Sequence, residues 1–209
     1  MRQHKQHKNT VSSRIINIAT VAVAIGIAAI LIAMAFSKGL QNEIRNKTSV
    51  FNGQILIAPF ENNESQVSLT SFKNSKEVQQ QIQKHTDFQR MHAVAIKAGM
   101  LKANDDFEGV LLKGVGSDFE WFSLDGFKTK GNYPNFKSEI NNEIFVSETI
   151  ANRLNLTVGD TVDAFFQSAQ TEGFPRRRKS KITGLYISGY PDIEQNFVFA
   201  DIRQLQSRN

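Results

Sequence analysis

Residues 15–36 read IINIATVAVAIGIAAILIAMAF and contain no charged side chain. At the helical rise of about 1.5 Å per residue, this stretch would be about 33 Å long, close to the roughly 30 Å hydrocarbon core of a bilayer. The segment before it is short and basic, and the segment after it is long, polar and patterned like an α+β domain. The sequence therefore predicts one membrane helix that carries one folded extracytoplasmic domain.

The positive charge of the chain is concentrated before this helix. Arg2, Lys5, Lys8 and Arg14 precede it without any acidic residue among them, and they account for most of the net charge of +5. Because basic flanks stay on the cytoplasmic side of a membrane, we expect residues 1–14 to be a cytoplasmic basic tail. The main domain would then be exported. A nucleic-acid partner is not expected, because the rest of the chain is nearly neutral.

A cleaved signal peptide is the alternative to a membrane helix. Residues 33–35 (Ala-Met-Ala) fit the small-x-small pattern for cleavage after Ala35. The apolar run is longer than the usual signal-peptide core of about 7–15 residues, which favours an uncleaved helix.

Small side chains recur along the apolar segment at three- and four-residue spacing. They are Ala22, Gly26, Ala29 and Ala33. Such a stripe lets a second helix approach closely in lipid, although alanine is also simply common in membrane helices. The pattern leaves both interpretations open.

The helical pattern continues beyond the apolar segment. Leu40 and Ile44 keep a one-face spacing, and the residues between them are tolerated in helices. We therefore expect a helical stalk over residues 37–50, followed by a core domain over residues 51–209. A rigid helix that runs from lipid into a domain can transmit movement; otherwise the stalk only holds the domain away from the membrane.

The core domain alternates short strands and short helices. Strands are predicted at residues 54–58, 92–101, 107–115, 143–146, 161–166, 182–188 and 197–200. The second and third of these would form an antiparallel hairpin. Ser147 and Asp201 are expected to cap short helices, and Ser117 with Glu120 to form a capping box.

Short motifs for catalysis or cofactor binding are missing from the sequence. It contains no GxxxxGK[ST], HExxH or GxSxG, and the lack of cysteine excludes disulfides and cysteine-based metal sites. His4 and His7 have no further ligands nearby, and Asp105 and Asp106 are interpreted as solvated loop acids. We therefore expect no enzyme activity, no catalytic residue, no metal site and no cofactor in this chain.

One run of charge stands out in the exported part. Residues 167–181 are polar and are expected to form a hairpin loop before the strand at 182–188. The basic run in this loop is either a solvated tip or a contact for acidic headgroups, an acidic partner or a carrier protein. The second interpretation gives a candidate partner-contact hairpin of Phe174, Pro175, Arg176, Arg177, Arg178 and Lys179.

Four phrases follow the helix in order: EGVLLKGVGSDFEW, EIFVSETIANRLNLTVGDTVDAFF, KITGLYISG and NFVFADIRQLQ. Together with the basic tail and the helix, they resemble the N-terminal half of ABC transporter permeases of the MacB/FtsX type. That group includes the lipoprotein-releasing LolC/LolE permeases. The resemblance covers most of residues 51–206, and it implies a MacB-like periplasmic core domain with two mixed α/β lobes.

The resemblance also implies a function and a set of partners. Such permeases lie in membrane lipid and pair with a second permease subunit. They also pair with a cytoplasmic ABC ATPase that hydrolyses ATP. They act by mechanotransmission, in which ATP-driven movement of the membrane helices moves the periplasmic domains. Lipoprotein-releasing members recruit a periplasmic carrier through a protruding hairpin, which residues 167–181 resemble in position. Since family permeases have three more membrane helices after this domain, we expect a fragment or a split subunit. The alternative is a secreted or anchored periplasmic binding or scaffold domain with no transport role.

Overall fold

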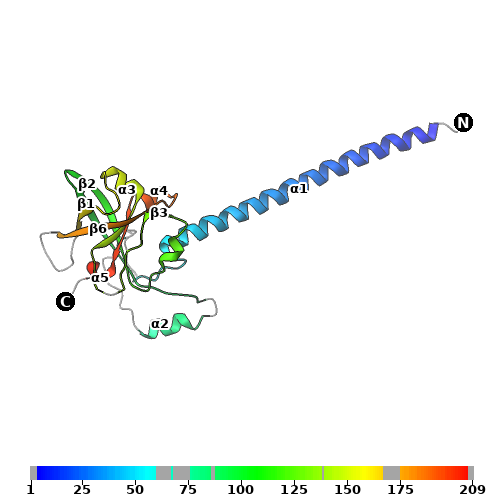
Figure 1. Cartoon of the computed structure of the whole chain (residues 1–209). Coiled ribbons are helices and arrows are strands. Elements are labelled where there is room, and N and C mark those ends of the chain that lie inside the picture. Colours follow the sequence, from blue (N-terminus) through cyan, green and yellow to red (C-terminus); the bar gives the residue numbers. More distant parts are fainter. Residues whose placement is uncertain are drawn as a thin grey trace. The chain divides into compact units, whose positions relative to one another are not determined.

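The structure is a computed structural model that describes residues 4–59, 67, 76–85, 88–137, 139–166 and 175–206. Contacts along the chain divide it into two units, Met1–Gly53 and Gln54–Asn209. The first unit contains one helix, and the second contains every described strand (Figure 1).

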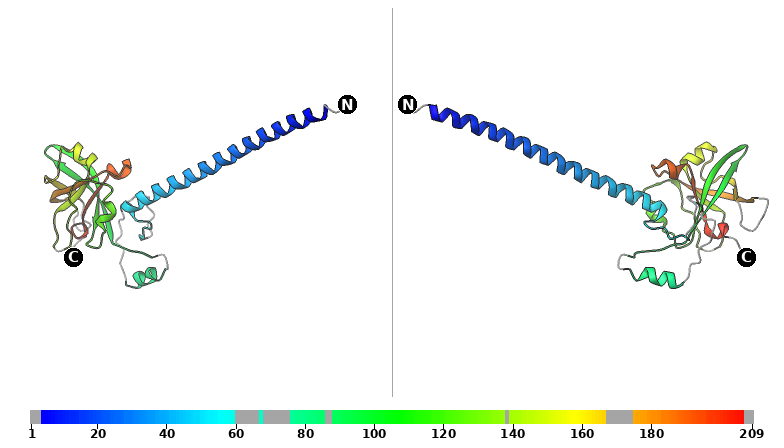
Figure 2. Two further views of the ribbon diagram at one scale, coloured as in Figure 1. Left: turned by 45° about the vertical axis from the view of Figure 1, so that its right-hand side comes forward. Right: turned by 180° about the vertical axis from the view of Figure 1, so that it is seen from behind.

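The first unit is α1 (His4–Asn52), a single helix of 49 residues. At the usual helical rise it is about 73 Å long, and both views in Figure 2 show it unbroken. It takes in the described part of the basic tail, the apolar segment and the predicted stalk. Gly53 ends it with a φ of 78°, a conformation that glycine adopts without steric cost, and donates its N–H to the carbonyl of Ser49.

The second unit is built on a seven-stranded sheet with the order β3-β6-β4-β7-β2-β1-β5. Its strands are β1 (Val94–Ala103), β2 (Asp106–Val115), β3 (Lys128–Gly131), β4 (Glu143–Ser147), β5 (Thr161–Phe166), β6 (Arg176–Tyr186) and β7 (Phe197–Asp201). Because β5 also pairs with β6, six strands close into a barrel, and β3 is added to β6. The short helices are α2 (Lys76–Gln83), η1 (Trp121–Leu124), α3 (Glu148–Arg153), α4 (Pro191–Glu194) and α5 (Ile202–Leu205).

Alternating apolar side chains fill the inside of the barrel. The cluster includes Leu101, Leu112, Val146, Val162, Ile182 and Val198. Helix α5 packs against β2 at Gly114, where an added Cβ would lie 2.8 Å from both Ile202 Cα and Leu205 Cδ1. Glycine at this position therefore permits the close approach of α5.

The outer face of β4, β6 and β7 carries a second, aromatic layer. Phe145 and Phe199 alternate with core residues and so point away from the interior. The Tyr186 ring lies 5.3 Å from Phe145 and 5.9 Å from Phe199 between centroids. Trp121 of η1 covers the layer, 5.7 Å from Phe145 and 5.8 Å from Phe199. The buried Tyr186 hydroxyl donates to the carbonyl of Phe197 at 2.8 Å.

The predicted fold class is confirmed as mixed α/β with one long apolar N-terminal helix. The β1–β2 hairpin is antiparallel, with Val94 opposite Val115. The helix caps are also confirmed. Ser147 Oγ accepts a hydrogen bond from the Ile150 N–H at 3.1 Å, and Asp201 Oδ1 accepts one from the Arg203 N–H at 2.9 Å.

Other details differ from the sequence-based expectations. Residues 54–58 are not a strand, and Ile55 is 84% exposed there. Ser117 and Glu120 do not form a capping box, because η1 begins at Trp121 and Glu120 makes no side-chain cap. All described strands belong to one sheet, whereas the resemblance implies two lobes.

Candidate functional site

The apolar part of α1 is the first candidate functional element. Among the described residues, α1 is the one helix that is long and apolar enough to cross a membrane, over Ser12–Asn52. A signal sequence would pass the same test. The large apolar side chains of α1 are exposed, with Ile18 at 71% and Phe36 at 72%. Leaving so many apolar groups in water is unfavourable, so we expect this surface to contact lipid or an apolar partner.

The polar side chains of α1 differ between its apolar segment and its stalk. In the apolar segment, Thr20 Oγ1 donates to the carbonyl of Ile16 at 2.9 Å, so this hydroxyl does not face lipid unsatisfied. In the stalk, Lys47 and Glu43 form an ion pair of 3.2 Å one turn apart, and both are exposed. The helix therefore changes from a lipid-compatible surface to a water-compatible one.

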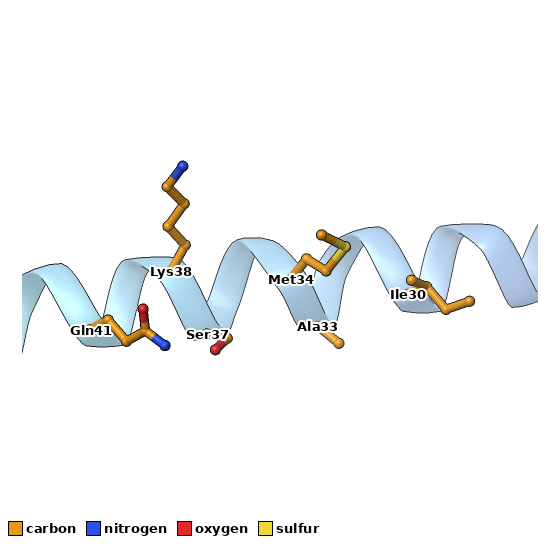
Figure 3. Close-up of a pocket in the computed structure, with 6 residues that line it drawn as sticks. All are labelled: Ile30, Ala33, Met34, Ser37, Lys38 and Gln41. Carbon is orange, nitrogen blue, oxygen red and sulfur yellow. The ribbon is translucent and has the colours of Figure 1, made fainter.

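One shallow depression lies along α1 near the end of its apolar segment (Figure 3). Its lining is Ile30, Ala33, Met34, Ser37, Lys38 and Gln41. All six residues belong to one face of one helix, so the depression is open and does not enclose a ligand. A Cβ added at Gly26 would meet no atom within 4 Å, so the small-residue face there is also uncovered by any described residue.

The second candidate element is the basic hairpin formed by β5 and β6. The two strands are antiparallel, with Phe166 opposite Arg176 and Asp163 opposite Lys179. The expectation that the basic run lies in a loop is therefore wrong: the run begins β6, because it pairs with β5. Pro175 precedes β6 and is exposed. Phe174 lies outside the described residues, as do residues 167–173.

Arg177 is held on the hairpin by an acid. Its Nη2 donates to Asp163 Oδ2 at 2.7 Å. The hydrogen bond from Arg177 holds the pKa of Asp163 below its usual range, with Lys179 and Lys102 adding to the effect. Asp163 Oδ1 is buried without a hydrogen-bond partner in the described part of the chain. Asp163 is thus an anion surrounded by three cations.

Arg176 and Arg178 alternate with Arg177 and so lie on the other face of β6. Burial lowers the pKa of Lys97 on β1, and the charge of nearby Arg176 lowers it further. No described carboxylate lies within ion-pair distance of Arg176, Arg178 or Lys179. The hairpin therefore has an excess of positive charge, which suits an acidic partner and carries out no chemistry by itself.

Other acidic and histidine side chains among the described residues do not gather into one site. Asp105 and Asp106 lie at the β1–β2 turn, and His92 lies against Phe119 with 5.1 Å between ring centroids. Among the described residues there is no group of three or more acidic or histidine side chains that could hold a metal ion. His4 and His7 are outside the part whose side chains are described.

Lys113 was missed by reasoning from the sequence. It is 3% exposed on β2, and its Nζ lies 5.7 Å from the Phe197 ring and 5.9 Å from the Phe199 ring. Burial lowers its pKa to about 8. The sequence signal for a buried lysine was its place inside the apolar strand GVLLKGV. That pattern alone does not show which face of β2 other residues cover.

Two solved structures are similar to the chain. One is the extracellular domain of the noncanonic ABC-type transporter YknZ from Gram-positive bacteria, with 14% identity, a TM-score of 0.43, and 62% of this chain and 63% of that chain covered. The other is the periplasmic region of MacB from Actinobacillus actinomycetemcomitans, with 14% identity, a TM-score of 0.40, and coverage of 58% and 52%. The chain covers less than two thirds of either.

No curated protein matches the chain. The family model described as the MacB-like periplasmic core domain matches residues 18–209. The match begins inside the apolar segment of α1 and includes all of the second unit. It confirms the resemblance found in the sequence and supports a role in a transporter permease. The chain belongs to the family of MacB-like periplasmic core domains.

Proposed function

We propose that the chain is the N-terminal portion of an ABC transporter permease, in which α1 passes movement from the cytoplasm to the periplasmic barrel. The observation that carries this proposal is the continuity of α1, which joins basic tail, apolar segment and stalk in one helix. A helix without a break moves as a stiff rod, whereas a flexible linker absorbs movement. Membership in the MacB-like family supports the same role.

The proposed setting is the cell inner membrane, with the tail in the cytoplasm and the barrel in the periplasm. The basic residues before the apolar segment favour this orientation. ATP hydrolysis would then take place in a separate cytoplasmic ABC ATPase, and a second permease subunit would complete the transport unit. The chain itself would supply mechanical coupling and no catalytic group.

Lipoprotein release is the proposed task, with the basic hairpin as a contact for a periplasmic carrier. The support is the likeness in position to the carrier-recruiting hairpin of lipoprotein-releasing permeases. A second support is the cations Arg176, Arg178 and Lys179, which have no ion-pair partner among the described residues. Positive charge on an exposed hairpin speeds the approach of an acidic partner and orients it.

A pair of insertions in the native protein that contains this chain tests the mechanical role. Seven Gly and Ser residues inserted after Gln41 would interrupt the helix, whereas seven helix-forming residues at the same place would keep it continuous and nearly in phase. We expect the flexible insertion to abolish ATP-driven transport while ATPase binding persists, and the helical insertion to retain transport. Equal transport by both proteins would refute the proposed coupling.

The competing assignment is a secreted or anchored periplasmic binding or scaffold domain. The first residue of the mature protein distinguishes the secreted form. A mature chain that begins at Phe36 would show cleavage after Ala35, whereas an intact basic tail is expected for the permease. Co-purification of an ABC ATPase in mild detergent would separate the permease from an anchored scaffold.

A further inference from the structure

Residues 88–93, here called the strap, lead directly into β1. Three contacts join them to the segment at 118–122. Arg90 forms an ion pair with Glu120, and its guanidinium lies 5.6 Å from the centroid of the Phe122 ring. The His92 ring meets Phe119 edge to face at 5.1 Å. The strap is therefore attached by one histidine and one arginine.

Phe119 connects the strap to the aromatic layer of the barrel. It is 7% exposed, and its ring lies 4.9 Å from Trp121 and 5.8 Å from Phe199 between centroids. Any change at His92 is thus next to rings that pack on the outer face of the sheet.

The charges around His92 come from each neighbouring segment. Lys113 lies on β2, Asp118 and Glu120 lie on the segment after β2, and Arg90 on the strap is engaged by Glu120. Burial lowers the pKa of His92, and the charge of Lys113 lowers it further, while Asp118 and Glu120 act in the opposite direction. Burial is the largest effect, so the attached strap favours neutral imidazole.

We propose that the strap is a pH-sensitive attachment, in which protonation of His92 separates its ring from Phe119 and releases residues 88–93 from the barrel. A protonated imidazole would lose hydration at this half-buried place and would stand near the positive charge of Lys113. Release returns the imidazolium to water.

The direction of the pH dependence follows from linkage. In the released strap, His92 has its ordinary pKa of 6.5, which is above the value in the attached strap. Between these two values the released form binds more protons, so attachment strengthens as pH rises and weakens as pH falls. Lys113, whose pKa is about 8, carries its charge throughout that window and adds to the repulsion.

The consequence for transport rests on the proposed function. The strap is the last part of residues 54–93, which join α1 to β1 along the chain. A strap released at acidic pH would weaken the proposed coupling between α1 and the barrel. The attachment itself is measured without any transport partner, so its failure would leave the proposed permease role untouched.

Trp121 offers a direct probe, because it is the only tryptophan in the chain and contacts Phe119. The full chain in detergent micelles is titrated from pH 8 to pH 5, with Trp121 emission reporting the aromatic layer and the NMR signal of His92 reporting its protonation. We expect both to change together, with a midpoint below 6.5.

Three variants decide the outcome. His92→Phe keeps an aromatic ring without a titrating group and should abolish the emission change. Lys113→Met should raise the midpoint, and His85→Gln, which replaces an exposed histidine, should leave it unchanged. A His92 midpoint at or above 6.5, an emission signal that does not follow His92, or the same emission change in His92→Phe would each overturn the proposal.

Discussion

Arg177 and Asp163 form an ion pair across β5 and β6, with 2.7 Å between Nη2 and Oδ2. This pair divides the basic run into two kinds of residue. Arg177 is engaged within the hairpin, whereas Arg176 and Arg178 lie on the other face of β6 without an ion-pair partner among the described residues. The two unpaired arginines are consequently the better test of a partner contact.

Replacing Arg176 and Arg178 together with alanine should weaken capture of an acidic periplasmic partner and leave the thermal midpoint of the domain nearly unchanged. Arg178 is exposed and Arg176 is half-buried, and charges near a protein surface contribute little to folding but much to association. Pull-down from a periplasmic extract, followed by a thermal melt, measures both. The matched control is Lys130→Ala with Lys137→Ala, which removes the same charge elsewhere. Undiminished capture by the arginine variant would contradict a docking role.

Asp163→Asn should reduce the loss of stability that the domain shows in acid. The pKa of Asp163 is lower in the folded protein than in the unfolded chain, where it is about 3.8. The stability that the ionised Asp163 carboxylate contributes is therefore fully present above the unfolded pKa, and it is lost as pH falls through the folded pKa. Chemical denaturation of both proteins between pH 7 and pH 2.5 measures the difference. Parallel stability curves for the two proteins would show that the ion pair has no net effect.

Lys113→Met should raise the free energy of unfolding by about 1–3 kcal/mol at pH 7, because it removes a buried positive charge. Folding lowers the Lys113 pKa from 10.5 to about 8, so the unfolded chain binds more protons between these values. The wild-type protein should therefore gain stability as pH rises from 8 to 10.5, and the advantage of the variant should shrink there. Denaturation at pH 7 and pH 10 tests this, with exposed Lys137→Met as the control. A destabilised Lys113→Met would show that the ammonium group makes a net favourable contribution.

Gly114→Ala should destabilise the second unit by about 1–3 kcal/mol, because the new Cβ would push α5 away from β2. The clash involves Ile202 Cα, which is backbone and cannot rotate aside. Gly109→Ala in the same strand is the matched control, since a Cβ there meets nothing within 4 Å. Urea denaturation should separate the two variants. Equal midpoints would mean that α5 does not depend on this close approach.

Sequence periodicity predicted those parts of the fold that depend on local chemistry. The alternation of Val162, Ala164 and Phe166 is the buried face of β5, and Ser147 caps α3. These patterns depend on neighbours along the chain, which a sequence displays directly. The family phrases added the fold class, which the family match confirms.

Non-local pairing explains the errors. The basic run of β6 reads as a loop because four cations suit solvent, yet β5 pairs with it through backbone hydrogen bonds that do not depend on side-chain type. Residues 54–58 have the composition of a strand, but no described strand pairs with them. The burial of Lys113 likewise depends on Phe197 and Phe199, which are more than 80 positions away.

The central claim is that α1 crosses the membrane and places the barrel outside the cytoplasm. The chain has no cysteine, so single cysteines at Ser13 and Ser117, which are both exposed, report the two sides without background. A membrane-impermeant maleimide applied to intact spheroplasts should label Ser117→Cys at once and Ser13→Cys only after lysis. Labelling of Ser13→Cys in intact spheroplasts, or protection of Ser117→Cys until lysis, would contradict the account.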